Sequence, residues 1–418
     1  MVDSSVLHGT AVGWFSSLSQ KEKHTFWGSF GGFAIDALDI QLYSFVVPTL
    51  ISLWSLSRTE AGMIATVALL VSAAGGWIGG TLSDRFGRVV TLQITIAWFT
   101  FFTVVSGLTT SYEQLLIVRA LQGFGFGAEW AIGAALMGEI VQAKHRGKAL
   151  GFVQSSWAIG WGAAALLYAV VFHFLPESLA WRALFLVAII PAFFVFYIRK
   201  FIEEPKVFVE AIREGAPKAR LIDIFSRDLI YTTIFTSLLA TGVQGGFYAI
   251  ATWLPTYLKT VRGLSTLNTS GYLGVIIVAA FFGYIIGAYL TDAIERRLTF
   301  ALFAVGSIAT VAAYTFFPIS DSWTLLLGFP IGFCYAGTFA GLGSYFAELF
   351  PTRVRGTGMG FAYNFGRAVG ALFPTLVGYI SSMIALETAI GIFTVSSYAL
   401  VLIAILALPE TKGRVLQP

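Results

Sequence analysis

Two carboxylates, Asp36 and Asp39, stand three residues apart in an otherwise apolar stretch near the beginning of the chain. A spacing of three places both on one face of a helix, and Tyr43 continues the same stripe. Two close carboxylates in a low-dielectric environment repel each other, and burial disfavours their ionised forms. The pair is therefore suited to take up and release a proton. Pairing with an arginine that fastens two helices together is the alternative interpretation.

Arg119 and Glu129 interrupt a second apolar stretch, where they share one helical stripe with Gln122 and Phe126. A rise of 1.5 Å per residue separates Arg119 from Glu129 by about 15 Å along the helix. A charge inside a bilayer is costly, so each of these groups needs a partner or water. We expect Glu129 to be a proton site or to be satisfied by hydrogen bonds. Arg119 is either a partner of an acid or a clamp on backbone carbonyls.

Arg367 is a further charged residue within an apolar stretch, with Tyr363 one helical turn earlier and Asn364 beside it. A planar guanidinium presents several donors in a fixed fork and binds a carboxylate through two parallel hydrogen bonds. We therefore predict that Arg367 anchors a carboxylate ligand, with Tyr363 and Asn364 adding polar contacts. A structural pair with Glu348 or another acid of the second half is the alternative.

Gln244, Tyr248 and Thr252 form a polar stripe with a spacing of four on another apolar segment. Gly245, Gly246 and Pro255 in that segment permit local bending, which a gate requires. Gln244 and Tyr248 are predicted ligand contacts, although such stripes in membrane helices often serve packing. Tyr43 and Gln154 are further candidates for the ligand site.

The elements that carry these residues are predicted to be transmembrane helices. Hydrophobic residues make up 57% of the 418 positions and charged residues 11%, whereas a soluble domain has about 25% charged residues. A span needs about 20 mostly apolar residues. Such runs occur at 26–51, 60–81, 89–109, 112–137, 148–174, 180–199, 229–257, 270–291, 298–317, 322–347, 357–382 and 385–407. The fold class is therefore an all-α membrane protein with twelve transmembrane helices.

The positions of the cations predict how this bundle is oriented. Four of the 26 Lys and Arg residues lie in loops on one side, two lie within spans, and all others lie on the side that both termini share. Because cytoplasmic loops are enriched in Lys and Arg, both termini are expected to be cytoplasmic. The expected organisation is a lead-in at 1–25, a six-helix bundle at 26–199, a cytoplasmic linker at 200–228, a second bundle at 229–407 and a tail at 408–418.

The two predicted bundles repeat a pattern. Gly-Thr-Leu-Ser-Asp-Arg-Phe-Gly-Arg at 80–88 follows the second span, and Gly-Ala-Tyr-Leu-Thr-Asp at 287–292 follows the eighth. Glu139 precedes Arg146 by the same spacing as Glu348 precedes Arg355. An internal duplication across a membrane bundle is the architecture of alternating-access carriers. The halves should be pseudo-symmetric.

The motif at 80–88, together with Arg119-Ala-Leu-Gln-Gly-Phe-Gly-Phe-Gly127 and Pro409-Glu-Thr-Lys-Gly413, resembles the signature motifs of the major facilitator superfamily. Ile35-Asp-Ala-Leu-Asp39, Gly127-Ala-Glu-Trp130 and Tyr363-Asn-Phe-Gly-Arg367 resemble the organic acid/proton symporters within it, the sialate/monocarboxylate branch first and aromatic-acid carriers next. The resemblance implies import of a small organic acid anion with protons across a bacterial inner membrane. It also implies that Arg119 tunes proton transfer by pairing with an acid, for which Asp36 or Asp39 is the candidate. The expected partners are the substrate and the lipid bilayer, around a functional monomer.

A cytoplasmic charge network is expected to hold the two halves together on the inside and to break when that side opens. Its members are Asp84, Arg85, Arg88, Glu139, Arg146, Asp292, Glu348 and Arg355. No phosphate-binding loop, enzyme signature or Cys/His spacing typical of a metal site is found in the sequence. We therefore expect no cofactor, with protons as the coupling ion. A proton-coupled exporter of drugs or other amphipathic solutes is the alternative carrier, and a scaffold without transport is the alternative of another class.

Overall fold

The computed structural model describes residues 13–16, 18–140, 143–187, 189, 193–204, 221–351 and 354–412. Helices dominate these ranges, and none of the residues described there forms a strand. The long helices contain the predicted apolar runs. Several of these helices extend past the run by a turn or more at a polar end. The helices are α1 (Gly13–Ser16), α2 (Gln20–Trp54), α3 (Arg58–Phe86), α4 (Arg88–Ser106), α5 (Tyr112–Ile140), α6 (Ala143–Phe174), α7 (Glu177–Val187), α8 (Phe194–Phe201), η3 (Leu221–Phe225), α10 (Ile230–Thr256), η4 (Tyr257–Val261), α11 (Thr266–Ala293), α12 (Arg296–Phe316), α13 (Asp321–Ala340), α14 (Leu342–Leu349), α15 (Arg355–Gly370), α16 (Phe373–Ile380) and α17 (Leu386–Ala407).

Three of the twelve predicted spans are not single α-helices. The span expected at 180–199 consists of α7 and α8, the one at 322–347 consists of α13 and α14, and the one at 357–382 consists of α15 and α16. Pro374 stands at the start of α16, where its missing N–H is tolerated. In the middle of a continuous helix, the same proline would remove a backbone hydrogen bond and break the helix. By length and composition, nine helical segments of the described chain can each cross a membrane.

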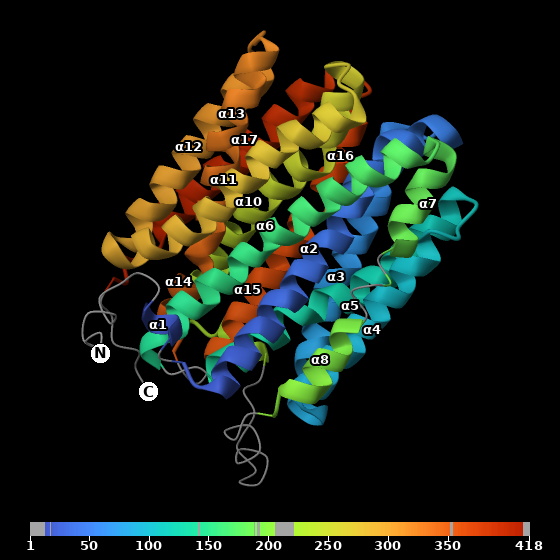
Figure 1. Cartoon of the computed structure of the whole chain (residues 1–418). Helices are drawn as coiled ribbons and strands as arrows, with labels where there is room; N and C mark the ends of the chain where they lie inside the picture. Colours follow the sequence, from blue (N-terminus) through green and yellow to red (C-terminus); the bar gives the residue numbers. More distant parts are fainter. Residues whose placement is uncertain are drawn as a thin grey trace, which may run out of the picture.

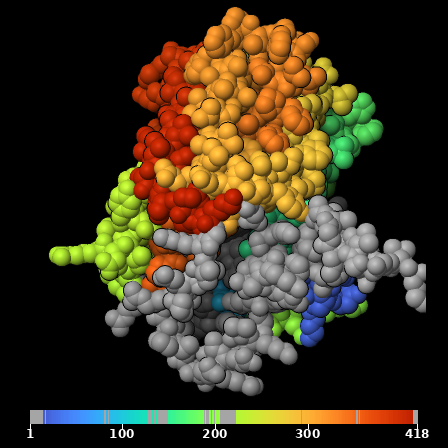
Figure 2. Space-filling view, turned by 90° about the vertical axis from the view of Figure 1, so that its left-hand side faces the viewer, coloured from blue at the N-terminus to red at the C-terminus, as the bar shows by residue number. Residues whose placement is uncertain are grey.

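The helices form two groups that pack in the same pattern (Figure 1). In the first group α3 packs on α5 and α4 packs on α5, and in the second α11 packs on α13 and α12 packs on α13. The yellow-to-red elements of the second group also lie together in Figure 2. Between the groups, α6 packs on α11, and α3 packs on α15 and α16. The fold is therefore two pseudo-symmetric six-helix halves, as the repeated motifs predicted.

Glycines at equivalent positions bring the central helices of each half into backbone contact. A Cβ on Gly123 of α5 would overlap the main-chain oxygen of Ala68 on α3, and a Cβ on Gly332 of α13 would overlap that of Ile276 on α11. Small residues allow such close approach in membrane helices, where packing replaces the hydrophobic effect as the driving force. Gly123 and Gly127 are therefore needed to hold α5, and its charged stripe, against α3, while Gly125 lies against Trp98 and Phe99 of α4.

A carboxylate after the last helix of each half caps the third helix of that half. Glu204 accepts hydrogen bonds from the backbone N–H groups of Arg88 and Val89, both at 2.8 Å. Glu410 accepts from those of Arg296 at 3.0 Å and Arg297 at 2.9 Å. Both caps satisfy free N–H groups at a helix start. They lie at the end of the bundle where the 200–228 segment connects the halves, which we call the linker side.

Candidate functional site: a buried charge axis between the halves

Asp36 on α2 and Glu129 on α5 lie next to each other in the interior of the first half. Both side chains are buried, with 0% and 3% of their surface exposed. Gly32 makes room for Glu129, because a Cβ there would overlap its Oε1 atom. Neither oxygen of Asp36 has a hydrogen-bond partner among the described residues, nor does Oε2 of Glu129. Two adjacent buried carboxyls without donors are stable when they share a proton.

Asp39 has a different environment from Asp36, although the two stand on the same helical face. The Gln122 amide donates a hydrogen bond to Asp39 Oδ2. Arg119 is the neighbouring cation, but its nitrogens do not come within the 4.0 Å of an ion pair with Asp39. Its guanidinium lies instead over the rings of Tyr43, at 5.4 Å, and Phe185, at 5.8 Å. The Asp39 and Arg119 charges interact, and Gln122 supplies the hydrogen bond to Asp39. The pairing expected between Arg119 and an acid stays a prediction.

Arg367 on α15 crosses from the second half to the first. Its Nη1 donates to the main-chain oxygen of Gly127 on α5 over 3.4 Å. The guanidinium lies over the rings of Phe126, at 5.0 Å, and Tyr363, at 5.1 Å, and only 2% of the residue is exposed. Nε has no partner among the described residues. Arg367 thus has donors available for a ligand, and it faces the half that holds the two carboxyls.

Glu348, the alternative partner for Arg367, is bound elsewhere. Its carboxylate accepts hydrogen bonds from Arg296, at 2.8 Å to Nη2 and 3.1 Å to Nε. Arg88 of the expected charge network donates to the Ser83 hydroxyl at 2.8 Å. Other members of that network have side chains outside the described residues: Asp84, Arg85, Glu139, Arg146, Asp292 and Arg355. The network stays a prediction, with Glu348 and Arg88 placed at the linker side.

The predicted ligand contacts separate into two groups. Arg367, Tyr363, Tyr248 and Gln154 line one small cavity between the halves. Gln244 does not reach it, because its amide donates to the Tyr363 carbonyl at 2.7 Å and accepts from the Tyr248 hydroxyl at 3.2 Å. Gln244 therefore positions Tyr248 and α15, and its contact with a ligand stays a prediction.

Asn364 and Tyr43 also lie away from that cavity. The Asn364 amide donates to the Gly360 carbonyl at 3.0 Å, and a Cβ on Gly76 of α3 would lie 2.5 Å from its Oδ1. Asn364 thus packs in the contact between α15 and α3. The Tyr43 hydroxyl donates to the Ala61 carbonyl at 2.6 Å, and its ring lines a second cavity.

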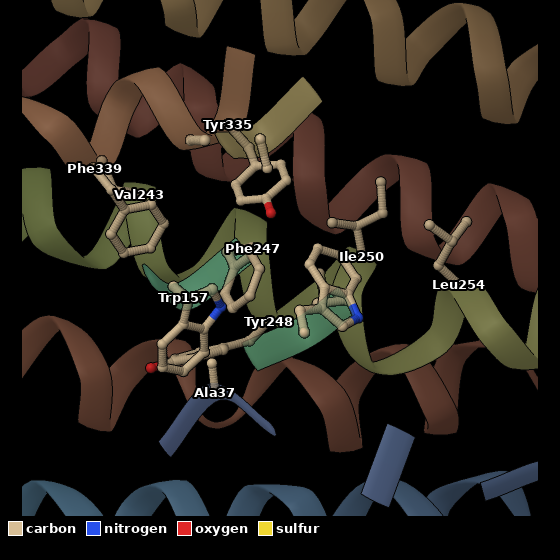
Figure 3. Close-up of a cluster of buried hydrophobic side chains, with 14 of the residues drawn as sticks. Ala37, Trp157, Val243, Phe247, Tyr248, Ile250, Leu254, Tyr335 and Phe339 are labelled. Atoms are coloured by element: carbon tan, nitrogen blue, oxygen red, sulfur yellow. The ribbon is translucent and has the colours of Figure 1, made fainter. Parts of the chain in front are cut away.

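The first cavity is mainly aromatic. Besides the four predicted residues it is lined by Phe33, Phe126, Trp157, Phe247, Tyr284 and Phe339. Figure 3 shows Trp157, Phe247, Tyr248, Tyr335 and Phe339 with their rings close together between the helices. The Phe247 ring lies 5.2 Å from that of Tyr335 and 6.0 Å from that of Trp157. No spacing or motif distinguishes the six added rings from the many other aromatic residues of the apolar runs, so they could not be selected before their helices were placed.

The cavity is closed on the side opposite the linker. Arg58 Nη1 of α3 donates to the Ser381 carbonyl at 3.0 Å, and the hydroxyls of Thr66 and Thr375 are 2.7 Å apart. Lys259 forms an ion pair of 2.7 Å with Glu177 between the halves. With a volume of about 20 Å³, the cavity has room for about one water molecule. The halves must therefore move apart before a solute can enter.

Known proteins with the same sequence pattern identify the family. The model of the major facilitator superfamily matches residues 29–374 and 277–416, and the chain belongs to this superfamily of transporters. It is 43% identical to a probable 4-methylmuconolactone transporter of Cupriavidus pinatubonensis, over 96% of this chain and 93% of that one. It is 31% identical to the cis,cis-muconate transport protein of Acinetobacter baylyi, over 86% and 88%. The sialic acid transporter NanX of Escherichia coli is a further relative, 25% identical over 94% of this chain and 96% of that one. The resemblance to the organic acid carriers is thereby confirmed.

A solved structure confirms the fold. The D-xylose–proton symporter superimposes with a TM-score of 0.74, covering 95% of this chain and 100% of that one at 20% identity. The chain is thus a multi-pass membrane protein with the twelve-helix architecture predicted from its apolar runs.

Proposed function

We propose that the protein imports a small carboxylic acid anion together with protons by alternating access. It would act as a monomer in the bacterial inner membrane, with the linker side in the cytoplasm and protons as the only coupling ion. The relatives that carry a muconolactone and cis,cis-muconate support an organic acid as the substrate. The aromatic cavity fits a small apolar body, and Arg367 fits its carboxylate.

One observation carries the coupling mechanism: Arg367 of one half donates to the Gly127 carbonyl of the other, two residues before the buried Glu129. Glu129 adjoins Asp36, on which the Arg367 charge also acts. When these carboxyls are ionised, they attract the Arg367 guanidinium and compete with a substrate carboxylate for its donors. Proton uptake neutralises the acids and leaves Arg367 with a positive charge that is best balanced by the substrate. Because a charge buried without a partner is unfavourable, the substrate-loaded, protonated state closes most readily.

Closure in this mechanism depends on Arg367 bridging the halves. The bond to the Gly127 carbonyl and the contact with the Phe126 ring both connect α15 to α5. A bound carboxylate would hold Arg367 between them while the Lys259–Glu177 pair and the linker-side contacts exchange. Release of the substrate and then of the protons on the linker side returns the carrier.

Uptake by purified protein in lipid vesicles tests this proposal. Radiolabelled cis,cis-muconate and benzoate, with 4-methylmuconolactone as a third probe, are offered at equal concentration inside and outside. We expect accumulation when the inside is alkaline, and none after a protonophore is added. Uphill accumulation that persists unchanged without a proton gradient would contradict symport.

A further inference from the structure

A second cavity lies beside the aromatic one, farther from the linker side, and an arginine also lines it. It is formed by α2, α3, α5 and α10, and its polar residues are Gln41, Tyr43, Ser44, Arg119 and Thr252. It therefore lies at the boundary of the two halves, because α10 belongs to the second. Its volume is also about 20 Å³ in this closed conformation.

Arg119 brings unused donors to this cavity. Only 1% of its surface is exposed, and neither Nε nor Nη1 has a hydrogen-bond partner among the described residues. The buried Nε2 of Gln41 also has no hydrogen-bond partner among the described residues. Buried donors of a charged group are rarely left unpaired, because their desolvation is not compensated. Asp39, whose charge acts on Arg119, accepts from Gln122 through Oδ2 and forms no hydrogen bond with Arg119 in this conformation, although its Oδ1 also has no partner among the described residues.

Two polar residues of the lining use their hydroxyl groups elsewhere. The Tyr43 hydroxyl is used for the Ala61 carbonyl, and Ser44 donates to Gln41 Oε1 at 3.5 Å. Tyr43 and Phe185 offer ring faces, which hold a guanidinium without consuming its in-plane donors. The arginine is thereby oriented with its hydrogen bonds still to be made, which favours a carboxylate ligand.

Phe247 and Tyr248 line both cavities. A solute that passes these two side chains therefore moves from Arg119 to Arg367. We propose that the second cavity is a separate anion subsite, where a substrate carboxylate binds Arg119 and Gln41 before it reaches Arg367. This inference rests on the proposed function for the nature of the solute and for the side from which it enters. It gives Arg119 a ligand-binding role in addition to its influence on Asp39.

Chemical protection of a single cysteine tests the subsite without requiring transport. Ser44→Cys is made in a Cys334→Ala background, which removes the one natural cysteine, and the vesicle-reconstituted protein is reacted with a maleimide. No proton gradient is applied, and cis,cis-muconate is the protecting anion. In Arg367→Gln, the concentration of cis,cis-muconate that halves the labelling of position 44 should change by no more than about twofold. In Arg119→Gln the half-protecting concentration should rise at least about tenfold, because a charge-assisted bond is lost.

Gln41→Leu keeps the test valid if Arg119→Gln does not fold, as judged by gel filtration and thermal melting. It removes the second unused donor while keeping Arg119, and the half-protecting concentration should rise about threefold. Protection that is lost in Arg367→Gln but kept in Arg119→Gln would overturn the subsite, as would no protection in the parent. Uptake measured separately on the same vesicles shows whether the proposed function fails as well.

Discussion

Arg367 in the second half donates a hydrogen bond to the main-chain oxygen of Gly127 in the first half, over 3.4 Å. The bond joins α15 to α5 at Gly127, two residues before Glu129. The Arg367 cation is therefore attached to the helix that carries one of the buried acids. An arginine that only anchored a solute would not need a contact with the opposite half. Its position links occupancy of the cavity to the relative position of the two halves.

Asp36→Asn and Asp39→Asn should each abolish gradient-driven accumulation while leaving substrate exchange largely intact. An amide keeps the shape and polarity of the side chain but cannot carry a proton. Accumulation is measured with an inward proton gradient, and exchange with substrate on both sides. Asp321→Asn is the control, because its side chain is 66% exposed. Parent-like accumulation in both variants would mean that Asp36 and Asp39 have a structural role only.

Arg367→Lys should weaken substrate binding at least about tenfold although the charge remains. A lysine cannot form two parallel hydrogen bonds to a carboxylate, and disruption of a buried charge pair typically costs about 2–5 kcal/mol. Arg119→Lys should disturb coupling more than affinity at the aromatic cavity. Calorimetry on both variants separates these effects. If affinity is unchanged in Arg367→Lys and clearly lower in Arg119→Lys, the two roles have been assigned in reverse.

Gly127→Ala should destabilise the protein by about 1–3 kcal/mol, as overpacking does elsewhere. Its Cβ would overlap the main-chain oxygen of Ser72, and backbone cannot yield as a side chain can. Gly271→Ala is the matched control, since nothing lies within 4 Å of its added Cβ. Melting temperatures in detergent compare the two. Equal melting temperatures would show that α3 and α5 are less closely held than the structure indicates.

Lys259→Gln should increase opening on the side opposite the linker by a few fold. The Lys259–Glu177 pair joins the halves, but its side chains are 21% and 48% exposed, so its contribution is less than about 1 kcal/mol. The labelling rate of Thr66→Cys, with Cys334→Ala, reports the opening. Lys21→Gln is the control, because the Lys21–Glu203 pair is 71% and 73% exposed and lies within the first half. An equal effect of both variants would exclude a latch at Lys259.

Glu410→Gln should lower the melting temperature at pH 7 and have little effect at low pH. Partial burial raises the pKa of the Glu410 carboxyl, but hydrogen bonds from the backbone N–H groups of Arg297, Lys412, Arg296 and Thr411 outweigh burial and bring the pKa below its ordinary value. A carboxyl with a lowered pKa stabilises the folded state above its unfolded pKa, and this contribution is lost as the pH falls through the folded pKa.

Glu295→Gln controls for a change of charge at the same helix start, because the Glu295 side chain forms no cap hydrogen bond. The measurement is a melting curve at pH 7 and at pH 4. A difference between Glu410→Gln and the parent that does not shrink at pH 4 would contradict the capping role.

The sequence by itself determined the membrane architecture. Apolar runs of about 20 residues can satisfy their backbone in a bilayer only as helices, so the count and order of the spans follow from composition. The repeat of Gly-rich and charged motifs determined the two halves. Asp36, Asp39, Arg119, Glu129 and Arg367 could be selected because a charge inside a span is costly, and a chain retains it only where a partner or a function compensates.

Tertiary structure decided which of these charges meet. The sequence could not distinguish Asp36 from Asp39, since both occupy one helical face, but the packing of α5 puts Glu129 beside Asp36 and Gln122 beside Asp39. It gave Gln244 hydrogen bonds with the Tyr363 carbonyl and the Tyr248 hydroxyl, and it placed Arg119 and Arg367 in two cavities. Helical periodicity determines on which face of its helix a side chain lies. It does not determine how the neighbouring helices are rotated. Contacts between helices far apart in the chain depend on how side chains of several helices fill the space between them, which no single segment encodes.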